Sequence, residues 1–303
     1  MKKQKPIYVE TNIHTQMDHL WDYTQKPHLH ERWDLRFSKI HYLEKEHEDD
    51  PQHFTYETKI GFGLGIKGTG VSKGERTTDS GDRTSSLGFF SGQPLSLIKE
   101  GSGYWKYKQE EAGRITFLTQ YDYKTRWGSF GKFVDKLVFR PMIGWATSWS
   151  FDSLRLWLEK GITPEDSLRR SLIHVILCFA LAFVWLYQGL VPKLLFPETG
   201  EVAMVMASGL FSGAEQVVVR LIGLIQCAIG LLFLMPINKK WLFAGSSVAV
   251  FLLGLGPMFV QPDVFTLPFN PATLNVAVIA LGMIGAMNVN DLPLARRCRR
   301  KRK

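Results

Sequence analysis

The pattern of hydrophobic and polar positions divides the chain into two halves and a joint. Up to about residue 125, apolar and polar residues alternate in short segments separated by glycine-rich turns. A two-residue period is typical of a strand with one buried face. Between residues 171 and 290 the sequence is apolar in long blocks that carry few charges. The pattern predicts a water-soluble domain and a membrane domain, joined by residues 130–172.

The soluble half is predicted to begin with a strand over residues 7–13 and a helix over residues 15–23. Thr15 is placed to cap this helix, with Asp18 at the capping-box spacing, and Pro27 ends the helix or its short continuation. Further strands are predicted over residues 36–43, 54–61, 65–71, 83–90, 103–108 and 114–124. The last segment alternates plainly, which indicates an antiparallel sheet with one covered face.

Only the helix expected after Gly128 is long enough to cover this sheet. Helical spacing gives it two apolar strips: Met142, Trp145, Trp149 and Leu156 on one face, and Phe151, Leu154 and Leu158 on another. We expect the first strip to cover the sheet. The second strip, with Trp157, is expected to meet a membrane surface, the membrane domain or another protomer, unless both strips fill one broad core.

A short link is predicted between the two halves. Gly161 suits the end of one helix, and Thr163 and Pro164 suit the start of the next. The predicted boundaries are residues 1–160 for the soluble domain, 161–170 for the linker and helix start, 171–290 for the membrane domain and 291–303 for a basic tail.

Four apolar blocks of membrane-spanning length are predicted, over residues 171–190, 217–235, 241–260 and 272–290. Asn270 and Pro271 suit the N-cap and first position of the helix that forms the fourth block. Basic residues lie before the first block, between the second and third blocks, and after the fourth. With four spans, all three basic sites fall on one side of the membrane, and basic loops favour the cytoplasmic side. We therefore expect a multi-pass cell-membrane protein whose N-terminal domain and tail are cytoplasmic.

Composition changes this picture little. The net charge is +9, but seven of the last eight residues are basic and follow a hydrophobic block. Such a tail favours anionic lipid headgroups over nucleic acid, which needs a basic stripe on a fold. The three cysteines form no CxxC motif, and the N-terminus lacks the apolar core of a signal peptide.

Three local motifs predict turns and no chemistry. Residues 63–68 match GxGxxG, but the residues after them form a poor helix, so a hairpin is favoured over a dinucleotide site. Seven of the eight histidines lie in the first 53 residues without a metal-ligand spacing on a helix. The acidic run over residues 44–50 is interpreted as a solvated turn. No catalytic residue, metal site or cofactor is predicted.

The order of elements, together with Ile7, Ile13, Trp21 and Trp33, resembles the START-like (SRPBCC) family over residues 5–160. The resemblance implies an α+β helix-grip fold, in which a curved sheet wraps a long C-terminal helix around an apolar cavity. Family members bind lipophilic ligands, and some catalyse cyclisation. The candidates for lining such a cavity are Trp21, Trp33, Tyr121, Met142, Trp145 and Trp149.

Polar residues near the ends of the spans are the candidates for a site in the membrane half: Gln188, Lys193, Glu198, Glu215 and Arg220. Alternatively, Arg220 extends to the interface or pairs structurally with Glu215. The run over residues 185–196, followed by Glu201, and the all-α four-span layout resemble the DoxX-like family. The joint also resembles that of proteins that fuse a START-like domain to a DoxX-like domain. Some DoxX relatives belong to quinone-linked complexes or take part in thiol and oxidant defence.

The leading hypothesis is a non-enzymatic protein whose cytoplasmic START-like domain binds a lipophilic molecule at the membrane face. The alternatives are a subunit of a quinone- or thiol-linked redox complex, a cyclase-like enzyme, and a packed module that stabilises or recruits partners. The expected partners are the lipid bilayer and a lipophilic small molecule but no nucleic acid, with a membrane-protein partner or a second copy of the chain as further options.

Overall fold

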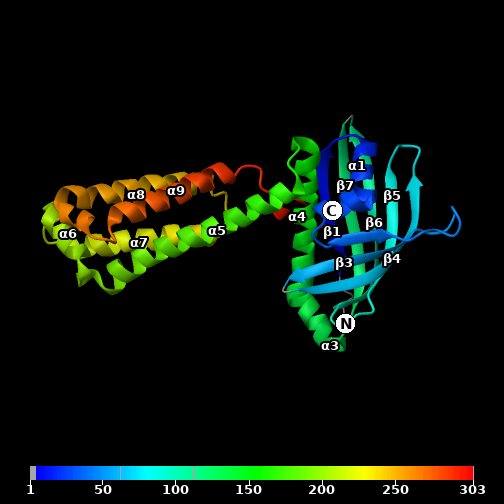
Figure 1. Cartoon of the computed structure of the whole chain (residues 1–303), viewed down its shortest axis with the longest axis horizontal. Coiled ribbons are helices and arrows are strands. Elements are labelled where there is room, and N and C mark those ends of the chain that lie inside the picture. The colour runs from blue at the N-terminus through cyan, green and yellow to red at the C-terminus, as the bar shows by residue number, and fades with distance from the viewer. Residues whose placement is uncertain (1–4, 62, 112, 303) are drawn as a thin grey trace. The chain divides into compact units, whose positions relative to one another are not determined.

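The computed structural model describes residues 5–61, 63–111 and 113–302, and these form two compact units. The first unit runs to Leu168 and also contains the C-terminal segment from Pro293, and the second unit runs from Arg169 to Leu292. In Figure 1 the sheet and the long helix α4 belong to the first unit, and the helices from α5 to α9 make up the second. The predicted division into a sheet-containing half and an all-helical half is confirmed.

The N-terminal unit contains a seven-stranded antiparallel sheet in the order β1-β7-β6-β5-β4-β3-β2. Its strands are β1 (Ile7–His14), β2 (Lys39–Tyr42), β3 (His53–Gly61), β4 (Leu64–Thr77), β5 (Arg83–Phe90), β6 (Ile98–Glu111) and β7 (Arg114–Thr125). From β2 to β7 each strand pairs with the next along the chain, as successive hairpins do, and β1 closes beside β7. The sheet is the one that the sequence predicts, with longer β4 and β6 than expected.

Two short helices, α1 (Met17–Gln25) and α2 (Pro27–Trp33), connect β1 to β2. The prediction that Thr15 caps α1 is wrong, because α1 follows Gln16 and the Thr15 hydroxyl lies 3.3 Å from His19 Nδ1. Pro27 follows the end of α1, as expected, and also opens α2, where its missing N–H costs no hydrogen bond.

A nearly continuous helical segment covers the sheet, made of α3 (Gly128–Val134), the π-helix η1 (Asp135–Phe139) and α4 (Arg140–Lys160). Phe151 and Leu154, from the strip expected to be spare, are fully buried, and Phe151 stacks on Phe117 of β7. Met142 and Trp145, expected to cover the sheet, are about half exposed. The assignment of the two strips is therefore wrong for Phe151, Leu154 and Trp145, whereas Met142 lines the space between the sheet and α4.

Small residues explain how α4 is turned. Gly144, Thr147 and Ser148 are buried, so this face of α4 carries small side chains where it packs. Small side chains let the helix approach the sheet closely along their own face. The prediction considered only bulky side chains, and it therefore assigned a neighbouring face of α4 to the sheet.

The C-terminal segment packs on the N-terminal unit. Arg299 pairs with Glu10 of β1 through two backbone hydrogen bonds of 2.9 Å. The Cys298 side chain is buried in the core, and Asp152 of α4 accepts hydrogen bonds from Leu294 N–H at 2.7 Å and from Arg297 at 3.3 Å. The segment thereby partly covers the outer edge of β1, a strand edge that would otherwise have unpaired backbone groups.

The second unit contains the helices that cross the membrane. Its elements are α5 (Pro164–Gly189), η2 (Leu190–Leu195), η3 (Pro197–Thr199), α6 (Glu201–Ser208), α7 (Glu215–Leu234), α8 (Lys240–Val260), η4 (Pro262–Thr266) and α9 (Pro271–Asn288), and η5 (Ala295–Arg297) lies in the C-terminal segment. Four of the described stretches are long and apolar enough to span: 164–195, 215–234, 240–260 and 271–288. The four predicted spans are confirmed.

The predicted helix ends are confirmed where the chain enters two of these spans. Gly161 ends α4 in a left-handed conformation with φ of 68°, and the Thr163 hydroxyl accepts from Asp166 N–H at 3.2 Å. Asn270 Oδ1 accepts from Thr273 N–H at 3.1 Å, directly before Pro271 opens α9. Three residues, 161–163, separate α4 from α5.

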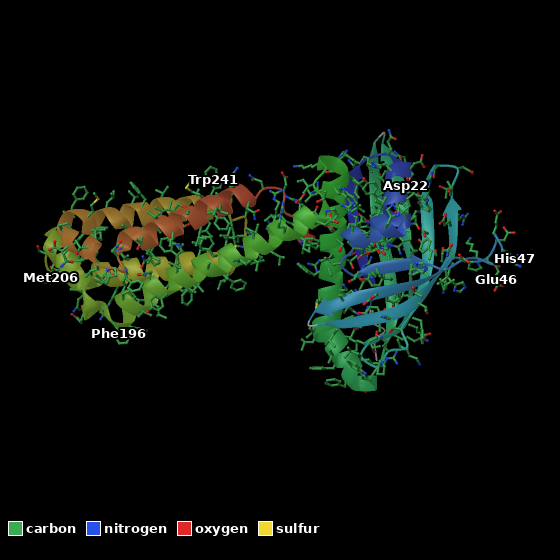
Figure 2. The ribbon with its side chains drawn as sticks, viewed as in Figure 1. Asp22, Glu46, His47, Phe196, Met206 and Trp241 are labelled. Atoms are coloured by element: carbon green, nitrogen blue, oxygen red, sulfur yellow. The ribbon has the colours of Figure 1, made fainter. Side chains whose placement is uncertain are left out.

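Within the bundle, helices pack at small residues and leave large apolar side chains outside. A Cβ on Gly189 of α5 would lie 2.6 Å from the carbonyl of Gly223 of α7, so only glycine fits at this crossing. Leu181, Phe233 and Phe243 form the buried core, whereas Trp241 lies on the surface (Figure 2). An apolar outer surface of this kind is what lipid chains solvate.

Candidate functional site

A cavity of about 290 Å³ lies between the sheet and α4 in the N-terminal unit. Its apolar wall comes from the sheet (Ile66, Leu87, Phe89, Ile98 and Trp105), from η1 (Phe139) and from α4 (Met142, Ile143 and Ala146). Gly103 of β6 also lines it, opposite Tyr121 of β7, and a Cβ there would lie 2.4 Å from Tyr121 Cβ. The volume is close to the lower end of small-molecule sites, about 300 Å³.

One wall of the cavity is charged. Arg36 binds the buried Asp34 through both ends of its guanidinium, with Nε at 2.8 Å and Nη2 at 2.6 Å. His30 Nε2 lies 3.1 Å from the same carboxylate. Burial alone would raise the pKa of Asp34, but the charge and hydrogen bonds of Arg36, together with His30, hold it well below its ordinary range.

Tyr121 lies beside this pair. Its hydroxyl is 2.9 Å from the Thr147 hydroxyl of α4, and the Arg36 guanidinium lies 5.2 Å from the centre of its ring. Burial raises the pKa of Tyr121, although Arg36 and Thr147 act in the opposite direction. At neutral pH the wall therefore has an ionised Asp34, a charged Arg36 and a protonated Tyr121. Asp34 uses two of the five Arg36 donors and the Tyr121 side chain is a further hydrogen-bond partner, so the remaining donors can serve a ligand.

The structure brings two of the six expected cavity residues to the cavity, Tyr121 and Met142. Trp33 lies in the core, where it packs on Trp105 and Phe151, and Trp21 packs against Tyr107. Trp149 is buried, and Trp145 is on the surface of α4. The four tryptophans therefore lie outside the cavity lining.

Sequence reasoning missed the charged pair. Asp34 and Arg36 follow α2 in the stretch Trp33-Asp-Leu-Arg36, in a turn that the Phe37 N–H closes by donating to the Asp34 carbonyl at 2.9 Å. An acidic and a basic residue at this spacing, between Trp33 and Phe37, was the signal that could have found them.

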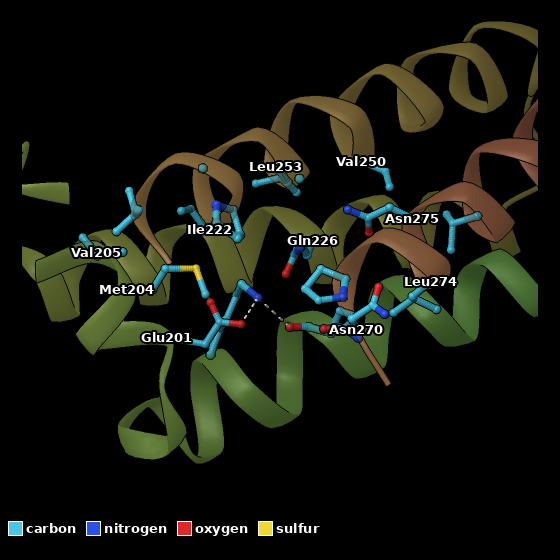
Figure 3. Close-up of a pocket in the computed structure, with 18 of the residues that line it drawn as sticks. Glu201, Met204, Val205, Ile222, Gln226, Val250, Leu253, Asn270, Leu274 and Asn275 are labelled. Carbon is cyan, nitrogen blue, oxygen red and sulfur yellow. Dashed lines mark hydrogen bonds and ion pairs between the residues drawn. The ribbon is translucent and has the colours of Figure 1, made fainter. Parts of the chain in front are cut away.

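A second cavity, of about 770 Å³, lies in the membrane unit. Figure 3 shows part of its lining, which comes from α5 and η2, α6, α7, α8 and α9. Gln188 and Lys193 from the expected polar site are among the lining residues. Lys193 Nζ lies 2.7 Å from Glu201 Oε1 and 3.4 Å from the carbonyl of Gln188. The polar site thus forms around Lys193, with Glu201 as its acidic partner.

The other three expected residues lie apart from this cavity. Glu198 accepts a hydrogen bond from Gln216, at 3.2 Å, and Glu215 accepts one from the backbone N–H of Gly213, at 3.0 Å. Arg220 is exposed on α7. Exposure near a helix start suits the alternative that Arg220 extends toward the interface.

The local motifs form turns and strands. The strand β4 follows Gly63, so residues 63–68 begin the second strand of a hairpin instead of a nucleotide-binding helix. Among the described residues, no group of three or more His, Cys, Asp or Glu side chains could hold a metal ion. Glu46 and His47 extend away from the sheet in a solvated turn (Figure 2).

Three solved structures are similar to part of this chain. A STAR-related lipid transfer protein fragment from Xanthomonas axonopodis is 12% identical, with a TM-score of 0.38, and the match covers 53% of this chain and 97% of that one. The Zhui aromatase/cyclase from Streptomyces sp. R1128 is 12% identical with a TM-score of 0.36, covering 50% and 96%. The hypothetical protein jhp0584 from Helicobacter pylori is 16% identical with a TM-score of 0.38, covering 50% and 86%.

The sequence comparisons extend over the membrane unit. The profile of the DoxX-like family matches residues 182–283. A curated relative, the uncharacterized membrane protein YndG of Bacillus subtilis (strain 168), is 41% identical over 301 residues, and the match covers 99% of each chain. The chain therefore belongs to the family of the membrane protein YndG and carries a DoxX-like region in its membrane unit.

Proposed function

We propose that the N-terminal unit binds a lipophilic molecule in the cavity between its sheet and α4, and does so at the face of the membrane. The observation that carries this proposal is the cavity itself, a space of about 290 Å³ that remains where the sheet and the helix could otherwise pack together. Apolar space of this size is unfavourable when empty, because its lining loses van der Waals contacts that a ligand would restore.

The charged wall defines the chemistry of the ligand. Asp34 and Arg36 compensate each other, so this wall offers donors without a net charge, and the other charged residue of the described cavity lining, Lys59, is exposed. An apolar body with one uncharged acceptor, such as a carbonyl or hydroxyl oxygen, matches the apolar wall and the remaining Arg36 donors, because the Tyr121 hydroxyl already donates to Thr147. A carboxylate would compete with Asp34 for Arg36.

An exposed apolar stripe supports a role at the membrane face. Phe130, Phe133 and Leu137, on α3 and η1, are each about two-thirds exposed. Lys132 and Lys136 lie between them, also exposed, as in helices that lie on a lipid surface. The stripe continues to Met142, which is half exposed and lines the cavity. A lipophilic molecule leaving a bilayer would meet apolar side chains up to the cavity.

The orientation follows from the basic residues. Arg170, in the first two turns of α5, donates to the carbonyl of Asn290, which follows α9, at 2.5 Å, so these two ends lie together. The basic residues near both ends favour the cytoplasmic side under the positive-inside rule. We infer that the N-terminal unit and the C-terminal segment are cytoplasmic.

Mass spectrometry of the organic extract of the purified full-length protein tests the proposal. The wild type should release a stoichiometric apolar compound with an uncharged polar head. Ala146→Phe fills the cavity from α4 and should abolish this release. Trp145→Phe is the matched control, because the neighbouring Trp145 lies on the surface, and it should retain the compound. Equal release from the wild type and Ala146→Phe would contradict the proposal.

A further inference from the structure

The cavity of the membrane unit combines apolar walls with buried polar atoms. It lies at the end of the bundle where α5 passes into η2, α7 begins, α8 ends and α9 begins. Its described lining includes two charged side chains, Lys193 and Glu201, which bind each other. The cavity is therefore polar at one side and carries no net charge from its lining.

Close helix packing places Lys193 at the cavity. Gly189 and Gly223 lie at a crossing of α5 and α7 too tight for any other residue, and a Cβ on Gly223 would lie 2.9 Å from Lys193 Cβ. Directly after Gly189 the chain widens into the π-helix η2, which contains Pro192. Such wide turns are frequent at functional sites. The Lys193 side chain is thereby held next to α7 with only 9% of its surface exposed.

Two buried polar atoms on facing helices have no hydrogen-bond partner within the described part of the chain. Gln226 of α7 is 6% exposed, and its Oε1 lacks a donor. Trp185 of α5 is 3% exposed, and its Nε1–H lacks an acceptor. Both residues line the cavity, and in Figure 3 the Gln226 side chain points into it. In an apolar surrounding, such groups are unfavourable unless a partner is supplied.

The two unpaired atoms specify what that partner offers. Gln226 Oε1 requires a donor and Trp185 Nε1 requires an acceptor, and a hydroxyl group supplies both. The compensated Lys193–Glu201 pair favours an uncharged headgroup over a phosphate or a quaternary amine. The apolar walls, from side chains such as Ile222, Val250 and Leu253, suit an acyl chain.

We propose that this cavity binds an uncharged, hydroxyl-bearing lipid of the acylglycerol class, with its hydroxyl groups at Trp185 and Gln226. This site is separate in sequence and in structure from the cavity of the N-terminal unit. The proposal does not depend on that cavity being occupied.

The test uses the full-length protein in lipid nanodiscs and a monoacylglycerol that carries a diazirine in its acyl chain. After irradiation, peptide mapping should place the label on segments that line the cavity, such as residues 250–257 and 271–278. An excess of unlabelled monoacylglycerol should suppress the labelling, whereas the methyl ester of the same acyl chain should not. Free glycerol should not suppress it either, because the headgroup alone lacks the apolar contacts.

Conservative variants test the polar contacts. Trp185→Phe removes the N–H and keeps an aromatic ring, and Gln226→Leu removes the amide at similar volume. Each should weaken the competition by unlabelled monoacylglycerol about fivefold. Trp241→Phe is the matched control, because Trp241 is exposed on the outer surface of α8.

Four results would overturn the proposal. They are labelling outside the lining segments, equal competition by the methyl ester, full competition by free glycerol, and equal behaviour of Trp185→Phe and Trp241→Phe. Label confined to α4 and the sheet would assign the lipid to the N-terminal cavity instead. Because the labelled peptides differ, failure here leaves the N-terminal cavity to be judged by its own test.

Discussion

Replacing Asp34 by asparagine tests whether the charged wall of the N-terminal cavity is a compensated pair. The substitution keeps the shape of the side chain and removes its charge, which leaves the Arg36 guanidinium without the carboxylate that it contacts at 2.6 and 2.8 Å. The Asp34 side chain is fully buried and that of Arg36 is 13% exposed, so water replaces the lost partner poorly.

The expected cost follows from buried ion pairs in general. Removing one partner of a buried pair typically costs about 3–5 kcal/mol, and partial access from the cavity places this case near the lower value, about 3 kcal/mol. For a unit of this size that corresponds to a decrease of about 6–12 °C in melting temperature. Adding Arg36→Met to Asp34→Asn should recover much of this stability, because it removes the uncompensated charge.

The pH dependence has a defined sign. The folded protein holds the pKa of Asp34 below its unfolded value, so the stabilisation is complete above about pH 4 and is lost as the pH decreases further. Asp34→Asn should remove this part of the acid sensitivity.

Urea unfolding of the full-length protein in detergent, followed by tryptophan fluorescence, measures both effects. Asp79→Asn, at an exposed turn, is the matched control and should behave as the wild type. Equal unfolding of Asp34→Asn and Asp79→Asn would refute the compensated pair.

Three further predictions concern the C-terminal segment and the bundle. Burial raises the pKa of Cys298 from 9.0 to about 12. In a variant with Cys178 and Cys227 replaced by alanine, iodoacetamide at pH 8 should therefore label the folded protein about a thousandfold more slowly than the urea-unfolded protein. Equally fast labelling of the two would show that the C-terminal segment is not docked. Asp152→Asn should weaken the docking of this segment by about 2–4 kcal/mol, because Asp152 binds Leu294 N–H, Arg297 and Arg155. The labelling of Cys298 should therefore become faster, and an unchanged labelling rate would contradict a role of Asp152 in docking. Gly223→Ala should destabilise the bundle by about 1–3 kcal/mol in thermal unfolding, whereas Gly245→Ala, with open space around the added Cβ, should be neutral; equal effects would contradict the close crossing.

The architecture could be predicted because its signals are local. Two-residue alternation marked the strands, the length of apolar blocks marked the spans, and Gly161, Thr163 and Asn270 marked helix ends. Each signal depends on residues near one another in the sequence. The N-cap at Thr15 failed because Gln16 could take the same position one residue later.

The sites could be predicted only in part, because they depend on packing between distant segments. Tryptophans were predicted to line the cavity because they are large. Trp33 and Trp149 are instead buried in the packed interior, where their size leaves no room for a cavity next to them. The cavity forms instead where Gly103 and Ala146 lie on facing elements. Lys193 was identified from its position near a span end, but its partner Glu201 and the unpaired Gln226 required the helix crossings to be known.

The docking of residues 293–302 on the N-terminal unit could not be predicted from the sequence. A run of basic residues after a span is typical of a tail that contacts lipid headgroups. Its pairing with β1 depends on an edge strand about 290 residues earlier in the chain. Nothing in the segment itself indicates that partner.

The most direct test of the central claim is an experimental structure of the full-length protein, purified without replacement of its natural ligands. We expect elongated density in the cavity of the N-terminal unit, in contact with Ala146 of α4 and with its polar end near Arg36 and Tyr121. A cavity filled by ordered water, or closed by side chains from the sheet and α4, would contradict the binding of a lipophilic molecule there.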